Sequence, residues 1–494
     1  MMSIKMHGGL KLPPHKVGST SRPIARGPRP RELVLPLTQH AGAPATPCIA
    51  VGDRVARGQP LALGDGPLSA AVHAPASGTV IAIEPRAVPH PSALAADCIV
   101  LATDAADHDW PGLRGHADWR MLTPAAVRAL VRAAGIAGLG GAAFPTHVKL
   151  DPLNPVDTLL LNGAECEPYI SCDDLLMRER AAEVVAGAEI MLHALQAQRC
   201  VIAIEDDKPE AIAAIERAIA AQSTAGEAIS VQVVPAIYPQ GGERQLVATV
   251  TGRRVPSGKL PLHVGVVCHN VATAAAVAAA VLDGEPLTRR IVTVTGAACA
   301  TPQNVDALLG TPVAELLAAC GGDAAPDARP TMGGPMMGFA LPHTGVPVVK
   351  GMNCVLLMGS ASNDSDPRSA QPCIRCTACE DACPAELLPQ QLHWFVRAQE
   401  LERARGHAVF DCIECGVCDA VCPSDIPLTA QFRWAKGELR ARDDDRRRAV
   451  LAKRRFDARA ARLAAEQRER EARLRKKQDP AAIDATLARI KASK

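Results

Sequence analysis

The chain has 494 residues, of which 48% are hydrophobic, 21% are charged and 2% are aromatic. This length exceeds what one hydrophobic core normally serves, so we expect several domains. A net charge of +2 argues against a strongly basic nucleic-acid-binding protein, and the scarcity of aromatic residues argues against a base-stacking surface.

The N-terminal region, residues 1–115, is rich in proline and glycine. The stretches VGDRVARGQPLAL (51–63) and AAVHAPASGTVIAI (70–83) predict short strands joined by tight turns. This pairing resembles the barrel-sandwich fold of biotinyl and lipoyl domains. A carrier domain of that family needs an exposed lysine on its hairpin, and residues 51–83 contain no lysine. We therefore expect a structural domain that is not a carrier.

Residues 120–285 alternate between apolar runs and helical segments. TPAAVRALVRAAG predicts a helix with Thr123 as N-cap, Pro124 in its first turn and Gly135 just beyond its end. Four apolar runs follow, at 157–162, 200–206, 229–235 and 263–268, with helical segments near 174–197, 208–221, 242–251 and 271–282. This alternation predicts a Rossmann-like α/β domain whose ligand site lies beyond the carboxyl ends of the strands.

Four short motifs in this domain are candidates for binding a phosphorylated ligand. GIAGLGGAAFPTHVKL (135–150) combines a glycine-rich loop with a lysine, and exposed backbone N–H groups with a cation suit a phosphate. A plain helix-ending turn is the alternative interpretation. NGAECEPY (162–169) follows a predicted strand, where it is either part of a ligand site or a solvated acidic turn. YPQGGERQLV (238–247) and CHNVAT (268–273) lie at two further element ends.

Residues 286–360 form a separate, smaller unit in the sequence pattern. RRIVTVTG and NVDALLGTPVAELLAACGG predict a strand, a turn and a short helix, which is compatible with a β-grasp-like module. The longest near-apolar run in the whole chain, VATAAAVAAAVL (271–282), is too short to span a bilayer, and the first residues lack the apolar core of a signal peptide. We therefore expect a cytoplasmic protein without a membrane span.

Residues 365–435 contain two cysteine runs, CIRCTACEDACP (373–384) and CIECGVCDAVCP (412–423). Each has the spacing C-x2-C-x2-C-x3-C followed by proline, as in two-cluster ferredoxins, where the fourth cysteine of each run crosses to the other [4Fe-4S] cluster. One ligand set would then be Cys373, Cys376, Cys379 and Cys422, and the other Cys412, Cys415, Cys418 and Cys383. Structural zinc sites or chance are the alternatives, but zinc motifs usually offer separated cysteine pairs.

The last region, residues 436–494, is dense in arginine, glutamate and alanine, with apolar residues at helical spacing. This predicts one or two charged amphipathic helices. Such a charge run is more typical of a docking segment or a solvated helix than of a catalytic element.

The motifs GLGGAAFPTHVK, NGAECEPY, YPQGGE and HNVAT, in this order, resemble the FMN- and NADH-binding flavoprotein subunit of respiratory NADH dehydrogenase and related hydrogenase subunits. When the N-terminal sandwich, RRVPSGKLP, MGGPMMG and the cysteine runs are included, residues 1 to about 430 most resemble the RnfC family of Rnf (Rsx) ion-translocating electron transport complexes. A flavin fits this set of cofactors because NADH gives up two electrons as a hydride whereas a [4Fe-4S] cluster accepts one.

The resemblance assigns roles to individual residues. A loop of Gly138, Gly140 and Gly141, with Lys149, would hold the FMN phosphate and ring. Asn162 and Asn270 would make polar contacts to the flavin, and Glu165, Tyr238 and Glu243 would help to shape the flavin and nicotinamide pocket. The flavoprotein has arginines at the positions of Ala137 and Leu139 and a glycine at the position of Ala143. The resemblance therefore implies an altered or weaker grip on the nucleotide in this chain.

The resemblance implies a peripheral subunit on the cytoplasmic side of the bacterial inner membrane. It would exchange electrons between NAD(H) and a low-potential carrier such as ferredoxin, through FMN and two [4Fe-4S] clusters. Its partners would be the other subunits of the membrane Rnf complex, and no nucleic acid. Two alternatives stay open: a soluble NADH-linked flavoprotein subunit of a hydrogenase or diaphorase, and a non-catalytic iron–sulfur relay with a decayed nucleotide site.

Overall fold

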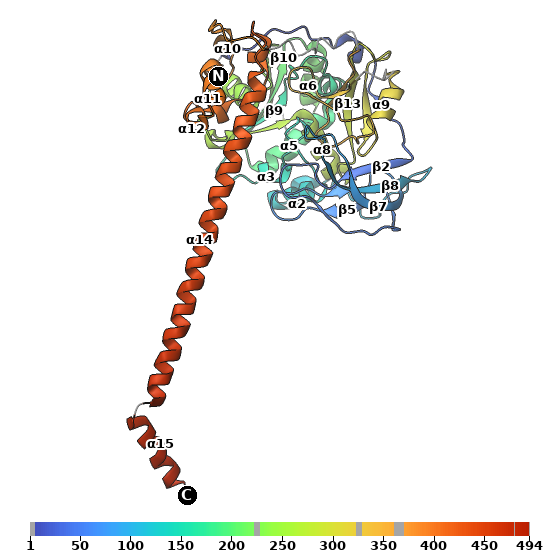
Figure 1. Ribbon diagram of the computed structural model, residues 1–494. Coiled ribbons are helices and arrows are strands. Elements are labelled where there is room, and N and C mark those ends of the chain that lie inside the picture. Colours follow the sequence, from blue (N-terminus) through green and yellow to red (C-terminus); the bar gives the residue numbers. More distant parts are fainter. Residues whose placement is uncertain (1–4, 222–227, 323–328, 360–369, 479, 494) are drawn as a thin grey trace.

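A computed structural model describes residues 5–221, 228–322, 329–359, 370–478 and 480–493. Figure 1 shows a body that contains every sheet, with the cysteine-rich region at one side of it. A single long helix, α14 (Leu428–Gln478), starts in that region and leaves the body, and α15 (Pro480–Ala492) follows it. Among the described residues, no helix combines the length and the apolar character needed to cross a bilayer.

The N-terminal domain is built from two small antiparallel sheets. One has the strand order β2-β8-β7-β4 and the other β3-β5-β6. The strands of the two sheets are β2 (Glu32–Pro36), β3 (Thr46–Pro47), β4 (Arg54–Val55), β5 (Pro60–Leu63), β6 (Val72–His73), β7 (Gly78–Ala87) and β8 (Ala95–Thr103). Leu33, Leu35, Leu61, Ile99 and Leu101 are completely buried within this domain. The two predicted strand stretches therefore form the expected sandwich.

The central domain contains four parallel strands in the order β11-β10-β9-β12. These are β9 (Thr158–Gly163), β10 (Arg199–Glu205), β11 (Ile229–Val234) and β12 (Val266–Asn270), so each predicted apolar run forms a strand. In the register of β9 and β12, Asn162 and Asn270 are partners at the carboxyl ends of the two strands. Parallel pairing thus brings two of the motifs identified in the sequence side by side.

Helices α2 to α8 surround this sheet, with the 3-10 turn η1 (Trp119–Met121) before them and the π-helical turn η3 (Ala279–Asp283) after them. They are α2 (Pro124–Ala133), α3 (Thr146–Lys149), α4 (Cys172–Glu179), α5 (Ala181–Leu195), α6 (Pro209–Ala221), α7 (Glu243–Thr251) and α8 (Val271–Ala278). The Thr123 hydroxyl accepts a hydrogen bond from the Ala126 N–H at 3.2 Å, and Gly135 has φ of +66°, as the predicted cap and stop require.

The helix predicted over 174–197 is in fact two helices. Arg180 lies between α4 and α5 with a non-helical φ of −129°, and its guanidinium forms an ion pair with Asp306 at 3.0 Å. Asp306 belongs to β14 (Gln303–Leu308) of the next module. The apolar periodicity is continuous through Arg180, so the sequence pattern did not reveal the break.

The third module is a six-stranded sheet with the order β1-β14-β13-β17-β15-β16. It combines β13 (Arg289–Thr295), β14, β15 (Thr331–Met332), β16 (Phe339–Ala340) and β17 (Cys354–Leu356) with helix α9 (Val313–Ala319). Strand β1 (Ala25–Arg26), which follows the short helix α1 (Val17–Thr20), joins the sheet from the N-terminal region by pairing in parallel with β14.

The cysteine-rich region is helical. It contains α10 (Ala378–Asp381), α11 (Pro389–Arg397), α12 (Leu401–Gly406), the 3-10 turn η5 (Val409–Asp411) and α13 (Val417–Ala420). Helix α14 begins inside this region, and its residues Phe432, Ala435 and Leu439 are buried in the same apolar core. The charged tail is therefore a continuation of a helix that is anchored beside the cysteines.

Helices α5 and α8 approach each other closely at Gly187. A Cβ at this position would lie 1.9 Å from the carbonyl oxygen of Ala274, so the α8 backbone would have to move. We expect Gly187→Ala to lower the free energy of unfolding by about 1–3 kcal/mol through overpacking. Gly437→Ala is the matched control, because a Cβ there meets no atom within 4 Å and removes the helix penalty of glycine, about 1 kcal/mol. The midpoints of thermal unfolding of the two variants should therefore move in opposite directions from that of wild type. An unchanged midpoint for Gly187→Ala would contradict the close contact.

Candidate functional site

The glycine-rich loop lies against the start of α8. The Leu139 N–H donates to the Thr273 hydroxyl at 2.9 Å, and a Cβ at Gly140 would lie 3.2 Å from the Cβ of Asn270. Gly141 has φ of +101°, a conformation that favours glycine, and no atom lies within 4 Å of the position where its Cβ would be. The loop is therefore packed on one side and open on the other.

The two strand-end asparagines hold the turns around this loop. The Asn270 side-chain oxygen accepts from the Ala272 N–H at 2.8 Å and so caps α8. The Asn162 side-chain oxygen accepts from the Ala164 N–H at 3.0 Å, and its amide donates to the Gly241 carbonyl at 2.9 Å. Asn162 thus connects the end of β9 to the YPQGGERQ segment.

Lys149, the last residue of α3, reaches the same place. Its ammonium donates to the Glu243 carboxylate at 2.7 Å and to the Cys268 carbonyl at 3.0 Å. An ammonium group has three donors, so one remains for a ligand. The Lys149 and Glu243 side chains are 34% and 40% exposed, which leaves the pair accessible from outside.

The chemistry of these residues fits a phosphorylated flavin. An open glycine turn, the capped start of α8 and a lysine with a spare donor are the groups that phosphate recognition uses. Lys149 is the lysine that the loop itself contributes, and the buried guanidinium of Arg290 lies 3.4 Å from the Leu139 carbonyl of the loop.

Glu165 lies behind this network at the start of α4. Its carboxylate accepts from the Asp173 and Asp174 N–H groups at 2.9 Å and 3.3 Å, which caps the helix. The Asp173 carboxylate in turn accepts from the Asn270 amide at 2.5 Å. Burial, and then the nearby charge of Glu165, raise the pKa of Asp173 to about 7. Asp173 was not singled out in the sequence, where it resembles any aspartate at the start of a helix.

The Tyr238 side chain reaches the cysteine-rich region. Its hydroxyl donates to the Cys415 carbonyl at 2.7 Å, and its side chain is only 3% exposed. Burial raises the pKa of the phenol far above its usual value, so the group stays a hydrogen-bond donor. Tyr238 therefore connects the central domain to the peptide of a predicted cluster ligand.

Helix α7 makes further connections to the cysteine-rich region. Arg244 forms an ion pair with Asp411 at 2.9 Å, and the Gln245 amide donates to the Pro384 carbonyl at 3.2 Å. The residue before them, Glu243, faces Lys149. The segment 238–245 thus contacts the glycine-loop network and the cysteine-rich region at once.

The N-terminal residues seal the same boundary. Leu10 and Tyr238 exchange both backbone hydrogen bonds, at 2.7 Å and 2.9 Å, and the Gly9 N–H donates to the Ala382 carbonyl at 2.9 Å. A Cβ at Gly8 would lie 2.5 Å from the Ala382 oxygen. The sequence interpretation missed this role. The consecutive glycines Gly8 and Gly9, both with positive φ, were the available signal.

The eight cysteines of the two runs line two cavities, and each cavity takes three cysteines from one run and the fourth from the other. One cavity is lined by Cys373, Cys376, Cys379 and Cys422, and the other by Cys383, Cys412, Cys415 and Cys418. Four sulfurs around one cavity suit a [4Fe-4S] cluster. Burial raises the pKa of the Cys415 thiol to about 12. The thiolate form would therefore need the positive charge of bound iron to stabilise it.

The two cavities differ in where they lie. Cys383 and Cys415 are buried at the boundary with the central domain, where the Cys383 carbonyl lies 3.0 Å from the ring nitrogen of His7. Cys376 is exposed, and the neighbouring Ile374 is 67% exposed. The cavity containing Cys415 therefore lies on the side of the central domain where Tyr238 is, and the cavity containing Cys376 lies nearer the surface.

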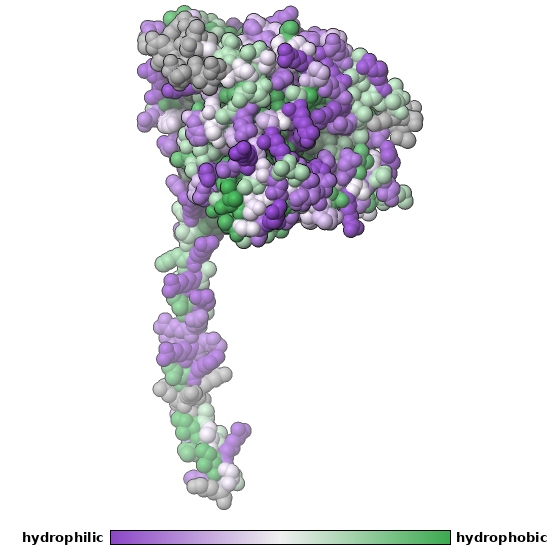
Figure 2. Space-filling view, turned by 90° about the vertical axis from the view of Figure 1, so that its right-hand side faces the viewer, coloured by the Kyte–Doolittle hydropathy of each residue, from purple (hydrophilic) through white to green (hydrophobic). Residues whose placement is uncertain are grey.

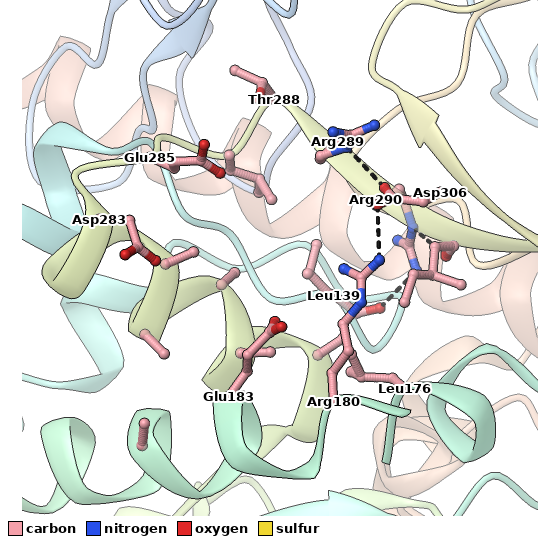
Figure 3. Close-up of a pocket in the computed structure, with 18 of the residues that line it drawn as sticks. Leu139, Leu176, Arg180, Glu183, Asp283, Glu285, Thr288, Arg289, Arg290 and Asp306 are labelled. Atoms are coloured by element: carbon pink, nitrogen blue, oxygen red, sulfur yellow. Dashed lines mark hydrogen bonds and ion pairs between the residues drawn. The ribbon is translucent and has the colours of Figure 1, made fainter. Parts of the chain in front are cut away.

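A separate cavity of about 650 Å³ opens between α4, α5, α8 and β13. Arg180 and Arg289 both pair with Asp306 at its edge, and Arg290 donates to the Leu139 carbonyl of the glycine loop at 3.4 Å (Figure 3). Its opposite side carries Glu183, Asp283 and Glu285. Leu139 and Asp173 line this cavity, whereas none of the predicted flavin-binding residues does. No sequence motif pointed to it.

Four family models match the chain. They are the RnfC barrel sandwich hybrid domain over residues 4–106, the Nuo51 FMN-binding domain over 131–279, the SLBB domain over 291–340 and the 4Fe-4S dicluster domain over 372–426. The predicted multidomain α/β fold, with its sandwich, flavin-binding, β-grasp-like and two-cluster parts, is confirmed, as is the prediction of FMN and two [4Fe-4S] clusters as cofactors.

Curated relatives extend over nearly the whole chain. The C subunit of the ion-translocating oxidoreductase complex of Pseudomonas aeruginosa is 49% identical over 94% of this chain and 59% of its own length. The protein of the same name from Pectobacterium atrosepticum is 48% identical over 98% of this chain and 70% of its own length. An NAD+-reducing [NiFe]-hydrogenase structure is 20% identical with a TM-score of 0.46, over 65% of this chain and 61% of that one.

The raised pKa of Asp173 predicts a pH-dependent contribution to stability. An unfolded aspartate ionises near pH 4, so the folded chain holds one proton more between about pH 4 and 7, and the stability from the neutral carboxyl is lost as the pH rises through about 7. Asp173→Asn should therefore unfold close to the wild-type temperature at about pH 4, and at an increasingly higher temperature than wild type as the pH rises to about 8.

Asp174→Asn is the matched control for this prediction. Asp174 forms an ion pair with Arg178 at 2.6 Å, so its loss should lower the unfolding temperature at both pH values. Thermal unfolding of the three proteins across this range measures the effect. A difference between Asp173→Asn and wild type that does not change with pH would refute the neutral carboxyl.

Proposed function

The chain belongs to the RnfC family, the C subunits of ion-translocating oxidoreductase complexes, and we propose on this basis that it exchanges electrons between NAD(H) and a low-potential carrier such as ferredoxin, through FMN and two [4Fe-4S] clusters. Its partners would be the other subunits of the membrane complex, on the cytoplasmic side of the bacterial inner membrane. We assign it five domains, at 1–115, 120–285, 286–360, 365–435 and 436–494.

One observation carries this proposal: the segment 238–245 contacts both candidate centres. Gly241 accepts from Asn162 and Glu243 pairs with Lys149 on one side, while the Tyr238 hydroxyl bonds the Cys415 peptide on the other. A chain that only stored a flavin or only held clusters would need no such contact between the two centres. This arrangement supports transfer of electrons between the two centres.

The glycine-loop network would hold the flavin. Lys149 would donate its remaining N–H to the phosphate, and the open backbone at Gly141 would let the ligand approach closely. Asn162 and Asn270 would orient the flavin ring and its ribityl chain through the hydrogen-bonding capacity that their contacts within the protein leave. When bound, FMN supplies the conversion between two-electron and one-electron transfer.

The cysteines would ligate the clusters in the crossed arrangement of two-cluster ferredoxins. The cluster of Cys412, Cys415, Cys418 and Cys383 would be the nearer one to the glycine loop. The cluster of Cys373, Cys376, Cys379 and Cys422 would be the outer one. The exposure of Cys376 supports the outer cluster as the point of exchange with a partner protein.

Anaerobic purification followed by titration with NADH tests the proposed function. Wild-type chain should contain one FMN and about eight iron atoms, as two [4Fe-4S] clusters require. NADH should bleach the flavin absorbance and then reduce a cluster signal. A flavin-loaded chain that NADH does not reduce would instead favour the iron–sulfur relay with a decayed nucleotide site.

Lys149→Ala should weaken flavin binding, because it removes the cation of the loop while Glu243 remains. We expect the flavin content of the purified variant to fall about tenfold, which corresponds to one charge-assisted hydrogen bond, while iron content stays the same. Lys491→Ala, an exposed lysine of α15 far from the body, is the control. Unchanged flavin content and NADH affinity in Lys149→Ala would remove Lys149 from the site.

Crossed ligation predicts which cluster each cysteine variant damages. Cys422→Ala should damage the cluster of residues 373–379, although Cys422 belongs to the second run, and Cys383→Ala should damage the cluster of residues 412–418. Paramagnetic resonance on reduced protein resolves the two centres, with Cys376→Ala and Cys415→Ala as reference variants. If Cys422→Ala matches Cys415→Ala, ligation follows the runs and the crossed arrangement is wrong.

A further inference from the structure

The outer part of α14 leaves the body just after Arg446, whose guanidinium pairs with Glu402 of α12 at 3.3 Å. Every residue from 447 to 475 is exposed, and Figure 1 shows the helix extending away from the cysteine-rich region over this length. In proteins most helical stability comes from the packing of one face of the helix and not from helix propensity alone. A long helix that presents all its faces to solvent therefore suggests that something else covers one of them.

This part of the helix is strongly basic. Residues 447–475 contain 11 arginine and lysine residues and 4 acidic residues, so their net charge is 11 − 4 = +7. Three of the four acids are already engaged within the helix. Glu466 pairs with Arg462 at 3.7 Å, Glu469 pairs with Arg473 at 3.2 Å, and Glu471 accepts from Gln467 at 3.3 Å. The excess positive charge calls for a partner with many negative charges.

One face of the helix also carries an apolar stripe. Phe456, Leu463 and Leu474 are 71%, 50% and 50% exposed. Phe456 and Leu474 are 18 residues apart, which is five whole turns of an α-helix, and Leu463 lies about 20° from their line. Figure 2 shows hydrophobic side chains along the helix among the hydrophilic ones. Basic residues border the stripe, including Lys453 and Arg459.

This pattern does not suit a coiled coil with a second copy. In the seven-residue repeat that contains Phe456 and Leu463, the next position is Arg470. Two parallel copies would also place +7 beside +7. A straight apolar stripe bordered by arginine and lysine is instead the pattern of a helix that lies in a lipid interface. A nucleic acid would satisfy the charge but would leave the stripe exposed.

We propose that residues 447–475 of α14 bind a bilayer surface that carries anionic phospholipids, with Phe456, Leu463 and Leu474 inserted between the headgroups and the arginines bonded to lipid phosphates. The helix would then bring the body to the membrane independently of other subunits. This inference rests on the shape and charge of the helix and does not depend on the proposed electron transfer.

Vesicle flotation of the full-length protein tests the proposal. The probes are vesicles of phosphatidylglycerol with phosphatidylcholine, and vesicles of phosphatidylcholine alone. Wild-type chain should float with the anionic vesicles and not with the neutral ones, and high salt should release it. The variant Leu463→Ser with Leu474→Ser should bind the anionic vesicles about tenfold more weakly or worse, because it removes two inserted side chains.

Val450→Ser with Leu451→Ser is the matched control. These two residues are 53% and 52% exposed on the same helix, but they lie at least about 120° around it from Phe456. Flavin and iron contents should be wild type in both variants, which separates this test from that of the proposed function. Four results would overturn the proposal: equal loss in both variants, equal binding to neutral vesicles, RNA binding without vesicle binding, or a dimer that Leu463→Ser with Leu474→Ser dissociates.

Discussion

The connection between the two candidate centres depends on the segment 238–245. In this stretch the Tyr238 hydroxyl donates to the Cys415 carbonyl, and the Gly241 carbonyl accepts from the Asn162 amide. The Glu243 carboxylate accepts from the Lys149 ammonium. The turn before α7 and the start of α7 belong to this one stretch of backbone. A displacement of the cysteine-rich region would therefore strain the glycine-loop network as well. The N-terminal residues 8–10 reinforce this boundary from the other side.

The different surroundings of the two cysteine sets have an energetic consequence. Buried cluster ligands lie in a low dielectric, whereas the set that includes the exposed Cys376 is accessible to water. Solvent exposure and hydrogen bonds to the sulfurs are among the properties that set cluster potentials. The chain can therefore separate the potentials of two chemically identical clusters by position alone. The basic part of α14, which extends from the same region, would then orient the outer set relative to a membrane.

The sequence predicted what local patterns determine. Apolar runs became the four parallel strands, and the shared carboxyl edge brought Asn162, Asn270 and the glycine loop together, as the α/β pattern implies. Cysteine spacing predicted the two groups of four. Long-range contacts were not predictable. Arg180, at the break between α4 and α5, pairs with Asp306, and the Tyr238 hydroxyl bonds the Cys415 carbonyl. Gly8 and Gly9 lie against Ala382 and Tyr238.

In the proposed electron path the cluster of Cys415 lies between the flavin site and the cluster of Cys376. Rapid-freeze paramagnetic resonance after mixing with NADH tests it in Cys415→Ser and Cys376→Ser proteins, with dithionite used to confirm which cluster remains. In Cys415→Ser the remaining cluster should no longer be reduced by NADH, whereas in Cys376→Ser it should be reduced at the wild-type rate. Reduction of the Cys376 cluster by NADH at an undiminished rate in Cys415→Ser would contradict the account.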